Sequence, residues 1–199
     1  MTHIRVAGRG RTVYVITGTP GTGKTTISTR IAKTISAEYV SVTRLVRRYG
    51  LESSFDHERR TRVVDLTRTR NRLRQLLRGN ERLVIVDTHL PECVPKDFVK
   101  KVIVLRCDPT VLESRLRAKG WRAGKVRENV LAELLDACLM VGVGYYGARR
   151  IFQLDTSHSS IRESVTSAAA ALKRPTTRGA QIDWIDTLEK QDRLTRYLL

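Results

Sequence analysis

Residues 18–25 of the chain read Gly-Thr-Pro-Gly-Thr-Gly-Lys-Thr, and this stretch decides the fold. Gly18, Gly23, Lys24 and Thr25 meet the pattern of a phosphate-binding loop, in which two glycines separated by four residues precede Lys-Thr. Average composition would produce such a match in about one chain in a hundred of this length. The apolar run from Val13 to Thr17 predicts a strand directly before the loop, as the chemistry of such loops requires. A glycine-rich turn without a ligand is the alternative.

The loop predicts how nucleotide phosphates are bound. Glycine lets the backbone curl so that successive N–H groups point at one phosphate, and the N-terminus of the following helix adds its positive end. We expect Lys24 to bridge the β- and γ-phosphates of ATP and the Thr25 hydroxyl to be a ligand of Mg²⁺. The residues of this segment that are expected to bind the nucleotide are Gly21, Thr22, Gly23, Lys24, Thr25 and Thr26.

Short apolar runs alternate with amphipathic segments along the chain, which is typical of an α/β fold with a parallel sheet. The run at 82–87 has no polar face and predicts a buried central strand. Asp108 and Pro109 predict the N-cap and the first residue of a helix. The expected strands span residues 13–17, 39–42, 82–87, 102–106 and 151–155. The expected helices span residues 24–36, 43–49, 56–77, 109–120, 126 to about 140, and 159–172.

An acidic residue ends the buried strand at 82–87. In P-loop enzymes Mg²⁺ is also held by an acid at the end of a neighbouring strand, and Asp87 meets this condition. We therefore predict Thr25 and Asp87 as the metal-side ligands. His89 follows two residues later, either as a residue of the site or as a solvent-facing loop histidine, and its spacing does not decide between the two.

The length of 199 residues suits one domain, expected at 1–178, with a helical extension at 179–199. The 37 Lys and Arg against 20 Asp and Glu give a net charge of +17, which predicts a polyanionic partner such as nucleic acid. The alternative is a basic surface without a partner. Arg70, Arg74 and Arg78 recur every fourth residue, so we expect them to form a stripe that contacts a phosphate backbone.

Targeting and redox signals are weak. No run approaches the roughly 20 apolar residues that a membrane span needs, and residues 1–12 carry arginines without an apolar core. We therefore expect no membrane association and a cytoplasmic protein. Cys93, Cys107 and Cys138 are odd in number and widely separated, so we expect buried or inert thiols in place of a disulfide framework or a zinc site.

Several segments carry a family resemblance. With the loop written Thr17-Gly-Thr-Pro-Gly-Thr-Gly-Lys-Thr-Thr26 and the later strand ending Val-Ile-Val-Asp87-Thr-His89, the chain resembles the adenylate kinase isoenzyme 6 family from about Tyr14 to Leu172. The Asp-x-His pattern separates this family from ordinary adenylate kinases. Other matching segments are Tyr39-Val-x-Val with Leu45 and Arg47, Arg62-Val-Val-Asp65, Arg115-x3-Lys119-Gly120-Trp121, and Asn129 with Glu133.

The resemblance implies a P-loop nucleoside-monophosphate-kinase fold: a parallel five-stranded sheet flanked by helices, a short lid at about 119–128 and an AMP-binding flap at about 43–80. It implies that Arg47 binds the AMP phosphate and that Arg115 and Lys119, with Arg122 as a further cation, lie over the transferring phosphoryl group. Positioned cations stabilise a transition state whose charge is spread over several oxygens. The expected catalytic residues are Lys24, Asp87, His89, Arg115 and Lys119, and Arg47 and Arg115 also bind nucleotide.

The chain departs from that family at Thr43-Arg44, where Gly-Asp is usual, and in a flap that is rich in arginine. Three functions stay open: an AMP kinase that forms ADP, an assembly ATPase that binds pre-ribosomal RNA and a small-subunit ribosomal protein, and an RNA-binding module with a vestigial loop. The intact loop, Asp87 and the lid cations argue against the third. The flap arginines are Arg59, Arg60, Arg62, Arg68, Arg70, Arg72, Arg74 and Arg78.

Overall fold

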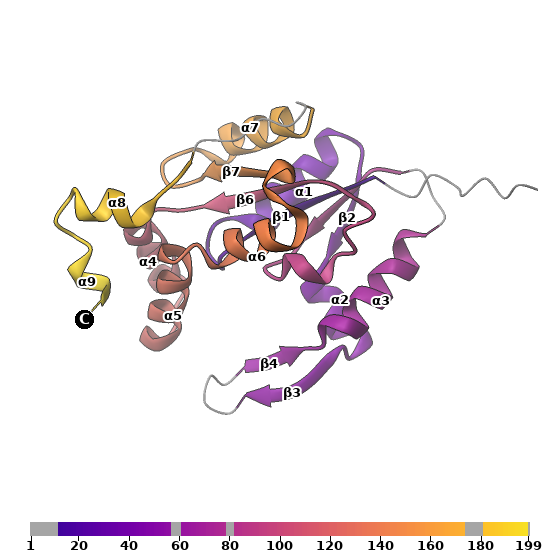
Figure 1. Cartoon of the computed structure of the whole chain (residues 1–199), viewed down its shortest axis with the longest axis horizontal. Coiled ribbons are helices and arrows are strands. Elements are labelled where there is room, and N and C mark those ends of the chain that lie inside the picture. The colour runs from indigo at the N-terminus through magenta and orange to yellow at the C-terminus, as the bar shows by residue number, and fades with distance from the viewer. Residues whose placement is uncertain (1–11, 57–60, 79–81, 174–180, 199) are drawn as a thin grey trace, which may run out of the picture.

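The computed structural model describes residues 12–56, 61–78, 82–173 and 181–198. Five parallel strands form its centre, in the order β2-β5-β1-β6-β7 (Figure 1). The predicted parallel five-stranded sheet is therefore confirmed, although the central strand is β1 and the predicted one, β5, lies beside it. The strands are β1 (Val13–Gly18), β2 (Glu38–Ser41), β5 (Val84–Asp87), β6 (Val99–Arg106) and β7 (Ile151–Asp155).

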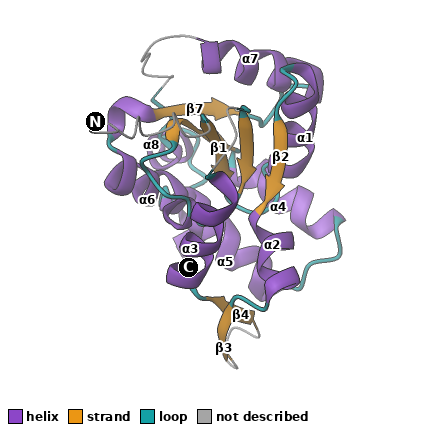
Figure 2. Cartoon of the chain, turned by 90° about the vertical axis from the view of Figure 1, so that its right-hand side faces the viewer, coloured by secondary structure: helices purple, strands orange, loops and turns teal. Residues whose placement is uncertain are grey.

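Helices cover both faces of the sheet (Figure 2). Side chains alternate along a strand, so in β1 Val13 and Val15 point to one face while Tyr14 and Ile16 point to the other. The Tyr14 face packs against α1 (Lys24–Thr34) and α7 (Ile161–Lys173). The Val13 face packs against α2 (Val42–Tyr49), α3 (Leu66–Leu77), the 3-10 turn η1 (Pro91–Cys93) and α6 (Ala137–Tyr146).

A third core cluster lies at the carboxyl ends of the strands. It joins α4 (Pro109–Ala118) and α5 (Ala123–Leu134) to the C-terminal helices α8 (Trp184–Glu189) and α9 (Thr195–Leu198). As predicted, Asp108 caps α4, because its carboxylate accepts a hydrogen bond of 2.7 Å from the backbone N–H of Thr110. This cluster places two helices directly behind the loop that follows β1.

The expected helix from Asp56 to Leu77 is wrong in the described residues before Leu66. Residues up to Val64 form an antiparallel hairpin, β3 (Glu52–Asp56) and β4 (Thr61–Val64), which projects from the body below α2 and α3 (Figure 2). The helix begins only at Leu66, because the Asp65 carboxylate caps it by accepting a hydrogen bond of 2.9 Å from the backbone N–H of Arg68. Asp65 is therefore the N-cap of this helix, which the spacing of apolar residues did not indicate.

The expected helix to about Met140 is two helices. α5 ends at Leu134, Asp136 adopts a left-handed backbone conformation with φ of 56°, and α6 begins at Ala137. Arg106 explains the break, because its guanidinium bonds both the Glu133 carbonyl, at 3.3 Å, and the Asp136 carboxylate. A side chain of β6 therefore binds the chain on both sides of the break. A second 3-10 turn, η2 (Ala148–Arg150), leads from α6 into β7.

The C-terminal segment docks its apolar residues on the third core cluster, as their helical spacing predicts, with one exception. Leu188 is buried and Ile182 and Leu194 are partly buried there, together with Trp184, whereas Ile185 is 42% exposed. The break between α8 and α9 at residues 190–194 changes the helical register. Arg59, Arg60 and the predicted start of the extension at Gly179 lie outside the described residues.

Among the described helices, none is by itself long and apolar enough to cross a membrane, and only α5 and α6 together, bent by 47° at their break, meet that length and composition. The three cysteines are free thiols. Burial raises the pKa of Cys93 and Cys107 to about 12 and also raises that of Cys138, so all three are protonated at neutral pH. The prediction of inert thiols agrees with these pKa values.

Candidate active site

The loop between β1 and α1, residues 18–25, is the phosphate-binding loop of the prediction, and its glycines are required by geometry. Gly18 has φ of 139°, and a Cβ atom there would lie 2.4 Å from the carbonyl oxygen of Leu105. Gly23, with φ of 94°, is the N-cap of α1 in a left-handed conformation. The loop therefore opens at the positive end of a helix of 11 residues, where anions bind favourably.

Thr25 and Asp87 come together across two adjacent strands. Ile16 of β1 lies opposite Asp87 of β5 in the sheet, and the Thr25 hydroxyl donates a hydrogen bond of 2.7 Å to Asp87 Oδ2. The same oxygen accepts a hydrogen bond of 3.0 Å from the phenol hydroxyl of Tyr39, a residue of β2. Asp87 is only 5% exposed, so these two hydroxyls hold its carboxylate in one orientation.

Lys24 folds back over the loop. Its Nζ donates a hydrogen bond of 3.0 Å to the carbonyl of Thr19, and desolvation lowers its pKa. Asp87 and Glu133 oppose this lowering. Lys24 is thus a half-buried cation whose partner among the described residues is a neutral carbonyl, so an anionic ligand would gain more from it than from a solvated lysine.

His89 lies at the mouth of two cavities that share a boundary. Desolvation and the positive charge of Lys24 lower its pKa, so the imidazole is neutral at pH 7. The first cavity, of about 680 Å³, lies between α2 and the β3–β4 hairpin. The second, of about 550 Å³, lies between the phosphate-binding loop, the hairpin and α5. Their common residues are Arg62, Val64, His89 and Leu90.

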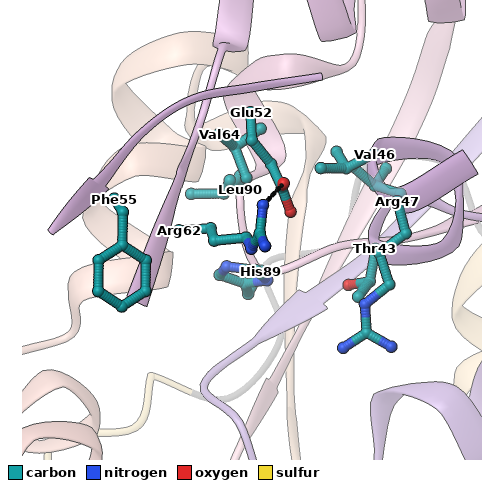
Figure 3. A pocket seen from close by; sticks show the side chains of 10 residues that line it. Thr43, Val46, Arg47, Glu52, Phe55, Arg62, Val64, His89 and Leu90 are labelled. Atoms are coloured by element: carbon teal, nitrogen blue, oxygen red, sulfur yellow. Dashed lines mark hydrogen bonds and ion pairs between the residues drawn. The ribbon is translucent and has the colours of Figure 1, made fainter. Parts of the chain in front are cut away.

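Arginines approach the first cavity from opposite walls. Arg47 reaches in from α2 and Arg62 from β4, with His89 beside Arg62 (Figure 3). Arg62 pairs with Glu52 of β3 at 2.8 Å and is 70% exposed, so this ion pair is weak and exchangeable. Phe55 presents an aromatic face that is 47% exposed at the outer end of the same cavity.

The lid cations do not share one environment. Arg115 donates hydrogen bonds of 2.6 and 2.9 Å to the carbonyls of Thr156 and Ser157, in the loop after β7. Lys119 is exposed at the C-cap of α4, and its charge contributes to the lowered pKa of Lys24. Lys119 therefore lies near the phosphate-binding loop, whereas Arg115 holds the loop after β7. Arg122 is the N-cap of α5, and Trp121 beside it lines the second cavity.

The predicted arginine stripe on α3 is wrong for two of its three members. Arg70 donates to the carbonyl of Glu92 at 2.7 and 3.2 Å, and Arg74 pairs with Asp97 through a hydrogen bond of 2.9 Å. These contacts anchor α3 to the segment at 92–97, so neither guanidinium is free to follow a phosphate backbone. Only Arg78 of the stripe is exposed without an ion pair among the described residues.

Sequence reasoning assigned no role to four residues that contribute to these cavities or to the loop. Tyr39, Arg62 and Glu133 occur in the segments that carry the resemblance, but their side-chain partners depend on tertiary contacts. Glu52 precedes the misassigned helix. The β-branched Val63 and Val64 are the weak strand signal that could have pointed to the hairpin.

Comparisons with known proteins support the family expected from the sequence. A family model described as an AAA domain matches residues 15–136. A protein of Thermococcus onnurineus named "Putative adenylate kinase" is 34% identical over 187 residues, which cover 94% of this chain and 97% of the relative. A protein of Caenorhabditis elegans named "Adenylate kinase isoenzyme 6 homolog" is 28% identical over 166 residues, which cover 83% and 88%. The matched segment contains the phosphate-binding loop, Asp87 and Glu133.

Solved structures show the same fold. A gluconokinase from Sinorhizobium meliloti has a TM-score of 0.56 at 17% identity and covers 90% of this chain and 97% of its own. A shikimate kinase from Bacteroides thetaiotaomicron has a TM-score of 0.54 at 18% identity, with coverage of 82% and 99%. At such identities the likeness concerns the fold alone, which is that of P-loop kinases.

Proposed function

We propose that this chain, which belongs to the adenylate-kinase-like family of P-loop proteins, transfers the γ-phosphoryl group of ATP to AMP. The bond between the γ-phosphorus and the β,γ-bridging oxygen breaks, a phosphate oxygen of AMP bonds to the γ-phosphorus, and two molecules of ADP result. In the absence of AMP, water takes the place of the acceptor and ATP is hydrolysed. The relatives named for adenylate kinase activity support this reaction class.

One observation carries the proposal. The cavity at the phosphate-binding loop and the cavity between α2 and the hairpin share four lining residues, Arg62 and Val64 of β4 and His89 and Leu90 after β5. Direct transfer between two nucleotides needs two adjoining sites, because the donor and acceptor oxygens must approach in line. A hydrolase needs only the first site. The cavity between α2 and the hairpin, with Arg47 and Arg62 on opposite walls, suits a dianionic phosphate.

The residues around Asp87 suit Mg²⁺. A hydroxyl and a carboxylate whose oxygens lie 2.7 Å apart, as those of Thr25 and Asp87 do, can share one small cation with phosphate oxygens and water. When bound, Mg²⁺ neutralises charge on the β- and γ-phosphates. Tyr39 fixes the carboxylate for this purpose.

Other residues bind and orient the substrates. Lys24 supplies a desolvated positive charge to the phosphates, and Lys119 adds a second cation from the end of α4. Arg47 binds the acceptor phosphate. His89, neutral at pH 7, orients the attacking oxygen at the shared wall of the cavities. Arg115 acts indirectly, because it holds the loop after β7. In that loop the Thr156 hydroxyl donates a hydrogen bond of 3.1 Å to the carbonyl of Thr22.

Replacement of Arg47 by Ala tests the acceptor site. We expect AMP-dependent ADP formation to fall by a transition-state loss of about 2 to 4 kcal/mol, the contribution of a charge-assisted contact to phosphate. Hydrolysis without AMP should stay near the parent value. Both rates are measured on one preparation, with Arg48→Ala as the matched control, because Arg48 is the next residue of α2 and does not line the cavity. Equal losses in the two assays would assign Arg47 to the ATP side or to stability.

A second candidate function, an ATPase of small-subunit maturation that binds pre-ribosomal RNA and a ribosomal protein, is favoured by the +17 charge and by one surface. On α2 and α3, Arg72 lies 4.0 Å and Arg48 5.6 Å from the ring centre of Tyr49, which is exposed. Arg68 lies one turn before Arg72. Cations beside an exposed aromatic ring are suited to single-stranded RNA, which combines phosphate contacts with base stacking.

Salt dependence tests that surface. Each phosphate contact to a single strand contributes about −0.7 to the slope of log affinity against log salt, so changing Arg48, Arg68 and Arg72 to Gln should flatten the slope by about two units. The control is Arg30, Arg162 and Lys173 changed to Gln, which removes the same charge from α1 and α7. Affinity for a single-stranded RNA is measured at several salt concentrations. Equal flattening in both triple variants would indicate only a general effect of charge.

A further inference from the structure

One buried carboxylate connects the phosphate-binding loop to the C-terminal segment. Glu133 of α5 is 2% exposed, and its Oε2 accepts a hydrogen bond of 2.6 Å from the Thr19 hydroxyl. Its Oε1 accepts three more, at 2.8 Å from Arg106 Nε, at 3.1 Å from the backbone N–H of Cys107 and at 3.1 Å from the indole N–H of Trp184. Four donors from three parts of the fold therefore fix one side chain.

Thr19 passes this constraint to the residues that bind phosphate. Its side chain is bonded to Glu133, and it is only 1% exposed. Its carbonyl accepts 3.0 Å from Lys24 Nζ and 2.9 Å from the Thr22 hydroxyl. A shift of Thr19 therefore moves the acceptor that holds Lys24. The position of the lysine depends on a carboxylate that lies 114 residues away from Thr19 in the sequence.

The C-terminal segment also completes the packing behind the loop. Trp184 is 6% and Leu188 0% exposed, in a cluster that contains Leu112 and Leu116 of α4. The same two leucines lie against Gly21, where a Cβ atom would come within 2.6 Å of Leu112. The guanidinium of Arg106 lies 5.9 Å from the ring centre of Trp184. The segment is thus linked to the loop in two ways, through Glu133 and through the two leucines of α4.

We infer that Trp184 and Glu133 are positioning residues, through which the C-terminal segment sets the conformation of the phosphate-binding loop. Neither side chain belongs to the nucleotide cavities, so both act through Thr19. Without the indole N–H, Oε1 keeps only the donors of Arg106 and Cys107, both at the end of β6. We therefore expect the carboxylate to turn toward β6 and to hold Thr19 less firmly. The inference rests on the proposed function only for its kinetic readout.

The first test is Trp184→Phe in the full chain, which keeps an aromatic ring and removes only the N–H donor. We expect kcat for ATP turnover to fall about tenfold, since misplacement of a reacting group by about 1 Å can cost up to about 100-fold. The protein should remain folded at the assay temperature, as judged by its melting curve. The control is Arg196→Gln, which breaks a contact of 2.8 Å with Glu113 from the same segment and does not touch Glu133. Its kcat should stay within about twofold of the parent.

A double-mutant cycle separates positioning from stability. Thr19→Val removes the hydroxyl bond to Glu133 with little change in the shape of the side chain, and Thr19→Ser should restore most of the activity. Because Thr19 and Trp184 act through one carboxylate, Thr19→Val combined with Trp184→Phe should lose little more than Thr19→Val alone. Thr19→Val combined with Arg196→Gln should give the product of the two separate effects. If Trp184→Phe does not fold, the Val and Ser variants of Thr19 still report on the Glu133 bond.

The outcomes are distinct. A parent protein that binds ATP without turning it over refutes the proposed function, and the same cycle is then measured as affinity for a fluorescent ATP analogue. An active parent with unchanged kcat in Trp184→Phe overturns the inference and leaves the function intact. Losses of Thr19→Val and Trp184→Phe that multiply also overturn it, because independent effects indicate that Trp184 contributes only to stability.

Discussion

We expect Lys24→Ala to lower kcat for ATP turnover by a factor of about 100 to 1,000 and to leave the fold intact. A single group that stabilises transition-state charge in a preorganised site has this magnitude of effect. The fold should tolerate the change, because burial lowers the pKa of Lys24 and so the folded state disfavours its charged form. Below the ordinary lysine pKa that cation costs stability, and its removal should leave the melting temperature unchanged or slightly raised.

The control for Lys24 is Lys33→Ala, in the last turn of the same helix. Lys33 is exposed and faces away from the phosphate-binding loop, so its replacement should leave kcat and KM unchanged. Steady-state ATP turnover and a melting curve are measured for both variants. Activity of Lys24→Ala equal to that of Lys33→Ala would remove the loop from the mechanism.

Asp87→Asn should have the second largest effect. The amide has the shape of the carboxylate and can still accept from Thr25 and Tyr39, so the fold should persist. The lost charge should lower Mg²⁺-dependent turnover by about 100-fold, a loss comparable to that of one electrostatic contact in the transition state. ATP affinity measured without Mg²⁺ should change much less.

The matched control for Asp87 is Asp97→Asn, which removes an acid that pairs with Arg74 at the surface. Turnover is titrated with Mg²⁺ in both variants. If Asp87→Asn and its parent require the same Mg²⁺ concentration and reach the same rate, another acid holds the cation.

Much of the fold could be predicted because its signals are local. The phosphate-binding loop identified β1 and α1, and the apolar run before Asp87 identified β5. Asp108-Pro109 placed the start of α4 correctly, since an N-cap acts on its own first turn. The hairpin was missed because Val63 and Leu66 fit a helical spacing as well as a strand followed by a cap. The break after Leu134 was missed because it depends on Arg106, a residue of another element.

The candidate site divides in the same way. Lys24, Thr25 and Asp87 could be named from spacing, since the loop and the neighbouring strand end determine where they lie. The partners of the Arg70 and Arg74 guanidinium groups could not be predicted, because the spacing of arginines along a helix does not show whether each is solvated or bonded to a neighbouring element. In the sequence, Glu133 was only one of the residues that match the family, and nothing indicated its partners. Its four donors come from positions 19, 106, 107 and 184, and only the folded chain brings them together.

The long sequence separations around the phosphate-binding loop also constrain how the protein matures during synthesis. The loop emerges from the ribosome early. The hydrogen bond to the Thr22 carbonyl, however, needs Thr156, 134 residues later, and the hydrogen bond of Thr19 needs Glu133. Trp184 reaches that carboxylate later still. Local contacts form before distant ones, because closing a long loop costs more entropy. During synthesis, the phosphate-binding loop therefore cannot have all of its native contacts until the residues around Trp184 have been made.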